Sequence, residues 1–255
     1  MKYIVLENKN NILWVTMDRE EVHNAFNAQL IQELYNVFTN LERSIKAIVL
    51  TGKGKSFSAG ADLNWMKEMI NYSEEENKED SLKLFDMVNS IKTCPVPVIG
   101  RINGSALGGG AGLVSACDIT FGLNKAKFGF TEVKLGLLPA AISPFVNHKI
   151  GQTHCSRYFL TGERFDGVIA NKINLLSEIF ETMEDLDTSL DLMLKHLEAN
   201  SPNAMKNSKK LIKYLNSDIN LTREYVAEQI AKARVSKEGQ EGLSAFLEKR
   251  QARFN

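Results

Sequence analysis

The sequence contains no long apolar run, no excess of charge of one sign and few cysteines. No segment approaches the roughly 18 apolar residues that span a membrane, and the N-terminus lacks the features of a signal or transit peptide. The 31 Lys and Arg residues balance 31 Asp and Glu residues, so the net charge provides no electrostatic footprint for nucleic acid. We therefore expect a cytoplasmic protein with neither a nucleic-acid nor a membrane partner.

The sequence also lacks the patterns of a metal site. The three cysteines are widely spaced and form no C-x-x-C pair, so zinc binding is not indicated. We expect them to be small buried hydrophobic residues in a reducing compartment. The four histidines show neither zinc-protease nor catalytic-triad spacing. We expect no metal.

Three nucleotide or nucleophile motifs are present only in part. Residues 54–56 resemble the end of a phosphate-binding P-loop, but Val49 replaces the glycine that begins that motif. Residues 108–112 lack the third glycine of a dinucleotide-binding turn, because Leu113 occupies its place. Ser58 lacks the glycine that precedes the serine in a nucleophile elbow. None of these three chemistries is predicted.

Two glycine-rich turns are the most informative feature that is present. The first turn, at 57–63, follows the apolar run 47–50, and the second, at 103–113, follows the run 96–99. Each run is typical of a buried strand. Small residues let backbone N–H groups approach a ligand closely. Two such turns can therefore direct two N–H donors at one oxygen, as in an oxyanion hole.

The remaining patterns predict an α/β core with a helical tail. Short strand-like runs alternate with helical spacing in the first half, and the chain from about 143 onward is mostly helical. Asn27 and Ser201-Pro202 are predicted helix starts. The acidic stretch 71–80 is predicted to be a mobile surface segment. We divide the chain into a core over 1–195 and a helical C-terminal region over 196–255.

Several motifs resemble those of the crotonase (enoyl-CoA hydratase/isomerase) superfamily. They are S-A-G-A-D-L at 58–63, N-G-x-A-x-G-G-G at 103–110, A-C-D-I at 116–119 and F-G-x-x-E at 128–132, with a matching tail at 238–250. The resemblance implies a spiral of ββα repeats with a helical C-terminal trimerisation region. It also implies an acyl-CoA thioester substrate, with coenzyme A as part of the substrate and no separate cofactor, and a homotrimer or a hexameric dimer of trimers.

The resemblance also assigns binding groups. The N–H groups of Ala61 and Gly109 correspond to the two oxyanion donors, which stabilise negative charge on the thioester oxygen. A larger side chain at Gly109 is expected to crowd that oxygen. The residues that match coenzyme A contacts in the family are Ser58, Ala59, Ala61, Asp62 and Leu63 in the first turn. In the tail they are Phe246 and Lys249, which match positions that reach coenzyme A bound to a neighbouring subunit.

Proton transfer to or from the substrate requires a carboxylate. Family hydratases usually carry two glutamates, and the corresponding positions here are Gly112 and Glu132. Glu132 is therefore the candidate acid/base. We expect the space beside Gly112 to be open to a water or a branched acyl group. Three activities remain: hydration by Glu132 alone, isomerisation by a single base, and other crotonase chemistry such as decarboxylation or hydrolysis.

The acyl pocket is expected to be apolar. Its candidate residues, which could equally belong to the core, are Trp65, Met66, Met69, Phe85, Phe130 and Leu138. The stretch 135–146 departs from the usual hydratase pattern. With Gly112, 62–66 and the tail, it is similar to bacterial methylglutaconyl-CoA hydratases of leucine catabolism. We therefore expect a lyase that hydrates 3-methylglutaconyl-CoA. The alternatives are a general enoyl-CoA hydratase, an isomerase and a non-catalytic CoA- or RNA-binding protein.

Overall fold

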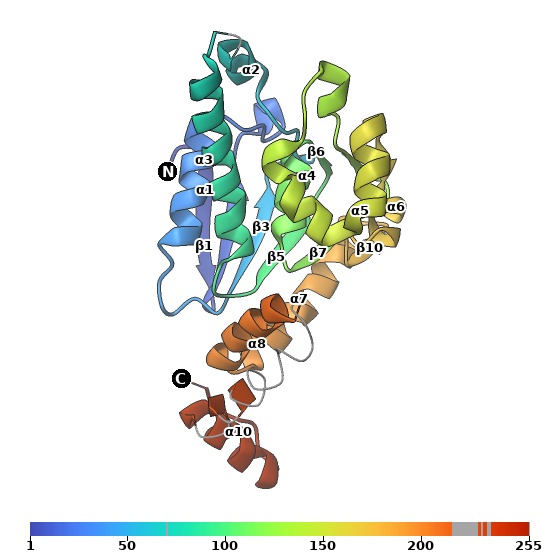
Figure 1. The fold of residues 1–255 in the computed structure, drawn as a ribbon. Helices are drawn as coiled ribbons and strands as arrows, with labels where there is room; N and C mark the ends of the chain where they lie inside the picture. Colours follow the sequence, from blue (N-terminus) through green and yellow to red (C-terminus); the bar gives the residue numbers. More distant parts are fainter. Residues whose placement is uncertain (70, 216–228, 231, 234–235, 255) are drawn as a thin grey trace.

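The computed structural model describes residues 1–69, 71–215, 229–230, 232–233 and 236–254 (Figure 1). Within these residues the larger sheet has six strands in the order β1-β2-β3-β5-β7-β10. Their bounds are β1 Ile4–Lys9, β2 Ile12–Met17, β3 Ala47–Gly52, β5 Val98–Ile102, β7 Ile119–Leu123 and β10 Glu178–Phe180. Only the β1–β2 pair is antiparallel, and the other neighbours are parallel.

The smaller sheet has four strands in the order β4-β6-β8-β9. Their bounds are β4 Ser56–Ser58, β6 Ser105–Leu107, β8 Lys127–Gly129 and β9 Phe165–Asp166. From β3 to β8, successive strands alternate between the two sheets, and each pair of strands is followed by helices. The helices after β4 are α2 (Leu63–Met69) and α3 (Glu74–Lys92), that after β6 is α4 (Gly109–Ala116), and those after β8 are η2 (Glu132–Leu135), η3 (Ala140–Ile142) and α5 (Ser143–Thr161). This repeated order confirms the predicted spiral of ββα units.

Local sequence explains several of these elements. All six residues of β3 are buried, as expected for a central parallel strand covered on both faces. The Asn27 side chain accepts a hydrogen bond from Leu30 N–H and begins α1 (Ala28–Thr39), which confirms the predicted cap. Residues 71–80 lie mostly at the surface, as predicted, but Ser73 and Glu76 form a capping box that begins α3 within this stretch.

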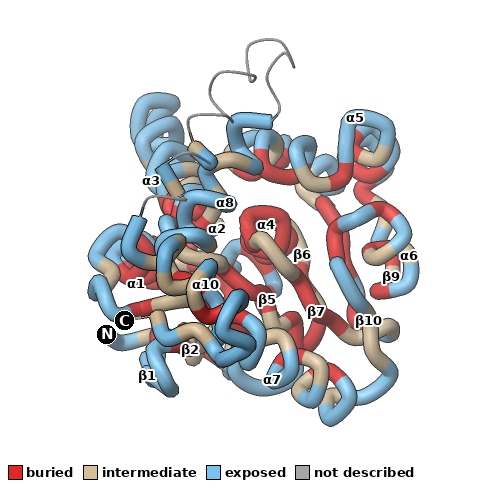
Figure 2. The backbone as a smooth tube through the Cα atoms, turned by 90° about the horizontal axis from the view of Figure 1, so that it is seen from below, coloured by how far each residue is buried: buried red, intermediate tan, exposed pale blue. Residues whose placement is uncertain are grey.

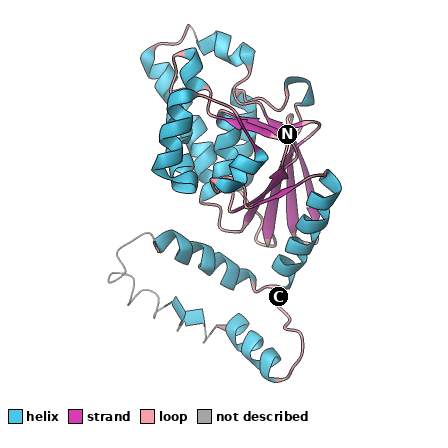
Figure 3. Ribbon diagram, turned by 90° about the vertical axis from the view of Figure 1, so that its right-hand side faces the viewer, coloured by secondary structure: helices cyan, strands magenta, loops and turns pink. Residues whose placement is uncertain are grey.

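Helices cover both faces of the larger sheet (Figures 1 and 3). On one face, α1, α3, α4 and α5 enclose the main hydrophobic core. On the other face, α7 (Met183–Ala199) packs Leu186 and Leu190 against Val49 and Phe121. The shorter helices η1 (Glu20–Val22) and α6 (Gly167–Lys172) lie on loops between strands. The three cysteines are free and buried, as predicted.

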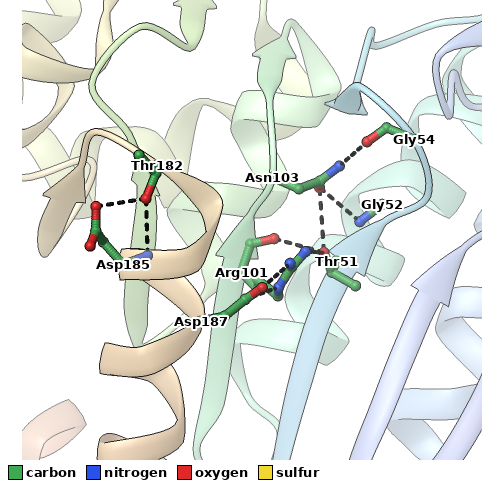
Figure 4. A network of polar contacts seen from close by, with 8 residues as sticks. All are labelled: Thr51, Gly52, Gly54, Arg101, Asn103, Thr182, Asp185 and Asp187. Atoms are coloured by element: carbon green, nitrogen blue, oxygen red, sulfur yellow. Dashed lines mark hydrogen bonds and ion pairs between the residues drawn. The ribbon is translucent and has the colours of Figure 1, made fainter.

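Polar contacts fix the edge at which β3 and β5 lead into the smaller sheet (Figure 4). The Asn103 side chain donates to Gly54 C=O at 2.8 Å and accepts from Gly52 N–H at 3.2 Å. Arg101 donates to both carboxylate oxygens of Asp187, at 2.6 and 2.7 Å, and this bidentate pair joins β5 to α7. These hydrogen bonds therefore fix the backbone from which the two glycine-rich turns begin.

The C-terminal helices extend away from the two sheets (Figures 1 and 3). They include α8 (Pro202–Tyr214), capped by Ser201 as predicted, and α10 (Lys237–Leu247). The helical C-terminal region is thus confirmed, whereas its role in trimerisation stays a prediction. The boundary predicted at 195/196 falls inside α7, and the division of the chain stays a prediction. Within the described residues, no helix is long and apolar enough to cross a membrane.

Candidate active site

Three sequence motifs meet at one edge of the smaller sheet. Strands β4, β6 and β8 are parallel neighbours, with Ser58 paired to Ala106 and Ala106 paired to Phe128. The carboxyl ends of parallel strands lie on the same side of a sheet. The turn at 58–63, the turn at 103–113 and the F-G-x-x-E segment therefore emerge side by side.

The first turn presents the N–H of Ala61. Phe26 N–H donates to Gly60 C=O at 2.6 Å, and Asp62 N–H donates to Phe26 C=O at 2.8 Å. In such a parallel bridge the C=O of Gly60 and the N–H of Asp62 form the hydrogen bonds to Phe26, so the N–H of Ala61 between them points away from Phe26. Among the described residues no acceptor is found for this N–H, and Ala61 is exposed. It is available to a ligand.

The second turn presents the N–H of Gly109, the first residue of α4. A first-turn N–H has no acceptor within its own helix, and it lies at the positive end of the helix dipole. The two turns are adjacent, because a Cβ on Gly60 would lie 3.6 Å from Gly109 N. Helix α4 itself lies buried between the other elements (Figure 2).

Gly109 has a neighbour that the sequence did not reveal. A Cβ at this position would lie 2.7 Å from Cε2 of the buried Phe26 ring. A side chain at Gly109 is therefore excluded by the protein itself, in addition to the predicted crowding of the thioester oxygen. Gly108 precedes it with φ 50°, a conformation that favours glycine.

Glu132 lies directly beside this turn. It begins η2, and its Oε1 is 3.1 Å from the position that a Cβ on Gly108 would occupy. Its Oε2 is buried without a hydrogen-bond partner in the described part of the chain. Burial raises the pKa of the Glu132 carboxyl, and a hydrogen bond from its own backbone offsets only part of that effect. A carboxyl in this state is suited to exchange protons beside the two donors.

The space beside Gly112 is already filled. A Cβ at Gly112 would lie 2.4 Å from Cγ2 and 2.8 Å from Cβ of Ile142, and both residues are buried. The expectation that a water or a branched acyl group could use this space is therefore wrong. Ile142 lies in the stretch 135–146, whose departure from the family pattern was the only available signal of this contact.

Comparison with known proteins agrees with this geometry. Residues 7–255 match the family model described as enoyl-CoA hydratase/isomerase. The chain belongs to this family. A crystal structure of a Legionella pneumophila protein assigned to the enoyl-CoA hydratase/isomerase (crotonase) group is 44% identical, covers 99% of both chains and has a TM-score of 0.90.

Two further members of the enoyl-CoA hydratase/isomerase family match almost end to end. The short-chain-enoyl-CoA hydratase of Clostridium acetobutylicum is 29% identical, and the match covers 97% of this chain and 95% of that protein. The 2,3-dehydroadipyl-CoA hydratase of Escherichia coli is 28% identical, with coverage of 100% and 99%. The names of these relatives share the hydratase reaction and differ in the acyl group.

Asp62, a residue of the family motif, forms a buried ion pair. Its Oδ2 accepts from Arg19 Nη2 at 2.8 Å, and its Oδ1 accepts from Asn64 N–H at 2.8 Å. Burial opposes ionisation, but the hydrogen bond from Asn64 and the Arg19 guanidinium outweigh it and lower the pKa of Asp62. In this conformation the carboxylate stabilises the first turn. The sequence did not identify Arg19, because its partner is distant along the chain.

The other residues of the first turn differ in exposure. Ser58 is buried, and its hydroxyl donates to Asn24 C=O at 2.9 Å. Ala59 and Leu63 are exposed, as Ala61 is. The surface of this family loop therefore consists of backbone and apolar groups. Its contact with coenzyme A stays a prediction.

The predicted acyl-pocket residues lie in different surroundings. Trp65 lines a polar pocket with Arg19, whereas Leu138 lines an apolar pocket with Leu160. The remaining candidates are Phe130, buried with its ring 5.2 Å from that of Phe159; Phe85, 5.1 Å from Phe145; and the half-buried Met66 and Met69. Neither of these two pockets contains both Trp65 and Leu138, and the lining of the acyl pocket stays a prediction.

The predicted tail contacts belong to the C-terminal helical region. Phe246 is in α10, but its side chain is outside the described residues. Lys249 follows α10 and is exposed, and α10 itself extends away from the sheets (Figure 1). The contact of these two residues with coenzyme A on a neighbouring subunit stays a prediction.

Proposed function

We propose that this chain hydrates the C2–C3 double bond of enoyl-CoA thioesters, with Glu132 as the acid/base and the N–H groups of Ala61 and Gly109 as the oxyanion donors. One observation carries the proposal. The Oε2 atom of Glu132 is buried, has no hydrogen-bond partner among the described residues, and belongs to a carboxyl that lies beside the Gly108–Gly109 turn. Proton transfer and charge stabilisation are therefore available at the same place.

The reaction balances with one carboxylate. The Glu132 carboxylate takes a proton from a water molecule as the water oxygen bonds to C3. The electron pair of the double bond moves towards the thioester, and the negative charge collects on its oxygen. The N–H groups of Ala61 and Gly109 stabilise that charge, and loss of one such donor costs about 3–4 kcal/mol in other enzymes. Glu132 then delivers the same proton to C2.

The raised pKa of Glu132 supports this double role. An acid/base works best when its pKa lies near the working pH, because it must both accept and donate the proton. Here burial shifts the pKa of Glu132 in that direction. Ile142 fills the space beside Gly112, so a single carboxylate must serve both proton transfers.

We propose 3-methylglutaconyl-CoA, an intermediate of leucine catabolism, as the substrate. The support comes from the sequence pattern of Gly112, 62–66, 135–146 and the tail. We further propose a homotrimer or a dimer of trimers, a cytoplasmic location and no cofactor apart from the coenzyme A of the substrate. Analytical ultracentrifugation of the purified protein distinguishes trimer from hexamer, and a monomer would contradict the proposed assembly.

The test is loss of the conjugated thioester absorbance with crotonyl-CoA and with 3-methylglutaconyl-CoA. We expect turnover of both, with the larger kcat/KM for the second. Glu132→Gln should lower kcat at least about 100-fold with little change in CoA-ester affinity. Glu178→Gln, a change at an exposed carboxylate in β10, is the matched control and should leave kcat unchanged.

Product analysis separates the alternatives. A hydratase yields the 3-hydroxyacyl thioester, an isomerase yields a shifted double bond, and a hydrolase releases free coenzyme A. Binding of CoA esters without any turnover would support a non-catalytic protein. Near wild-type kcat in Glu132→Gln would remove this residue from the mechanism.

A further inference from the structure

We infer that Phe26 is a positioning residue that holds the two oxyanion donors in their relative places. The inference rests on the proposed function and deepens it. Phe26 belongs to neither glycine-rich turn, and it lies before α1, far from both turns in the sequence. In the structure it contacts both donor-bearing turns, through its backbone on one side and its ring on the other.

The backbone of Phe26 holds the first donor. Its N–H donates to Gly60 C=O at 2.6 Å, and its C=O accepts from Asp62 N–H at 2.8 Å. These two bonds lie on either side of Ala61 and leave its N–H directed away from Phe26. A shift of the Phe26 backbone would therefore turn the Ala61 donor with it.

The ring of Phe26 holds the second donor. Its Cε2 and Cδ2 would lie 2.7 and 3.0 Å from a Cβ on Gly109, so the ring packs directly against the Gly109 backbone. Phe26 is only 1% exposed, and the ring has little freedom to move. The first residue of α4 is thereby seated against the same side chain whose backbone holds Ala61.

The residues before Phe26 anchor it. Ala59 N–H donates to His23 C=O at 2.9 Å, and Ser58 Oγ donates to Asn24 C=O at 2.9 Å. Arg19 adds a bond to Ala25 C=O and its ion pair with Asp62. The segment 19–26 is therefore hydrogen-bonded along the first turn, and Phe26, at the end of this segment, also contacts the second turn.

This arrangement predicts which kinetic constant depends on Phe26. Charge develops on the thioester oxygen in the transition state, so misplaced donors weaken transition-state binding more than substrate binding. Loss of the ring should therefore lower kcat and leave KM largely unchanged. A side chain with a merely structural role would lower stability without this separation.

The first test compares two buried phenylalanines. Phe26→Leu removes the ring from Gly109, and Phe121→Leu is the matched control, because Phe121 is also 1% exposed but packs under α7. We expect kcat for crotonyl-CoA hydration to fall about 10- to 100-fold in Phe26→Leu. This decrease is no larger than the decrease in kcat that the loss of one oxyanion donor causes in other enzymes. Phe121→Leu should keep wild-type kcat at a similar loss of melting temperature.

The second test observes the donors directly. Butyryl-CoA labelled with ¹³C at the carbonyl binds without being hydrated, and infrared difference spectra report its C=O stretch. We expect the wild type and Phe121→Leu to lower this frequency to the same extent, and Phe26→Leu to lower it less. Should Phe26→Leu fail to fold, Phe26→Met provides the same comparison.

The outcomes separate this inference from the proposed function. A full carbonyl shift together with wild-type kcat in a Phe26 variant would overturn the positioning role alone. Bound butyryl-CoA without a shift in the wild-type enzyme would refute the oxyanion hole, and both proposals with it.

Discussion

A side chain introduced at Gly112 should collide with Ile142, and the size of the effect follows from the structure. Its Cβ would lie 2.4 Å from Ile142 Cγ2 and 2.8 Å from Ile142 Cβ, whereas carbon contacts are optimal at about 3.5–4.0 Å. The second contact involves an atom fixed to the backbone, so a change of rotamer cannot relieve it. Overpacking of this kind lowers the free energy of unfolding by about 1–3 kcal/mol. The higher helix propensity of alanine relative to glycine raises it by up to about 1 kcal/mol.

We therefore expect Gly112→Ala to destabilise the protein by about 1–2 kcal/mol, which lowers the melting temperature by about 2–8 °C at the sensitivity of a domain of this size. Gly112→Glu adds a carboxylate at a buried position and should destabilise further. Activity towards both crotonyl-CoA and 3-methylglutaconyl-CoA should fall, because the first turns of α4 carry the Gly109 donor.

A double-mutant cycle tests the cause. Ile142→Ala removes the colliding atoms, so Gly112→Glu should cost less stability in that background than alone. The matched control is Ile173→Ala, another buried isoleucine truncation, which should give no such rescue. The measurements are melting temperatures and kcat/KM for each variant. If Gly112→Ala keeps wild-type stability, or Gly112→Glu gains activity without Ile142→Ala, the collision does not govern this site.

The remaining predictions concern three charged or crowded positions. Burial raises the pKa of Glu132 in the folded protein, so its ionisation lowers the stability of the fold as the pH rises above the unfolded pKa of 4.5. Glu132→Gln should therefore have a higher melting temperature than wild type near pH 8. Equal melting temperatures at that pH would contradict the burial of Glu132. Gly109→Val should abolish turnover and lower the melting temperature through contact with the Phe26 ring, so a stable, active variant would refute the hole. Asp62→Asn leaves Arg19 buried without its partner and should cost about 3–5 kcal/mol near pH 7. Since the pKa of Asp62 is lowered, that stabilisation is present above 3.8 and lost as pH falls further; an unchanged difference between wild type and variant from pH 7 to pH 3 in urea unfolding would contradict it.

Local features of the fold could be predicted because they depend on residues that are close together in the sequence. Asn27 and Ser201 begin helices through bonds to residues three positions ahead. The motifs carried the resemblance to the family, and that resemblance implied the ββα spiral. The start of α3 within the stretch 71–80 was not predicted, although Ser73 and Glu76 form a capping box there.

The sequence by itself therefore determined the strand–turn–helix order, the family and the candidate acid/base Glu132. Only the tertiary structure decided how these parts meet. Arg19 lies 43 positions from its partner Asp62. Ile142 fills the space into which a side chain at Gly112 of α4 would project. Phe26 contacts two turns to which it does not belong. Such contacts arise when one sheet and its helices stack on another, so no periodicity or spacing within a short stretch of sequence encodes them.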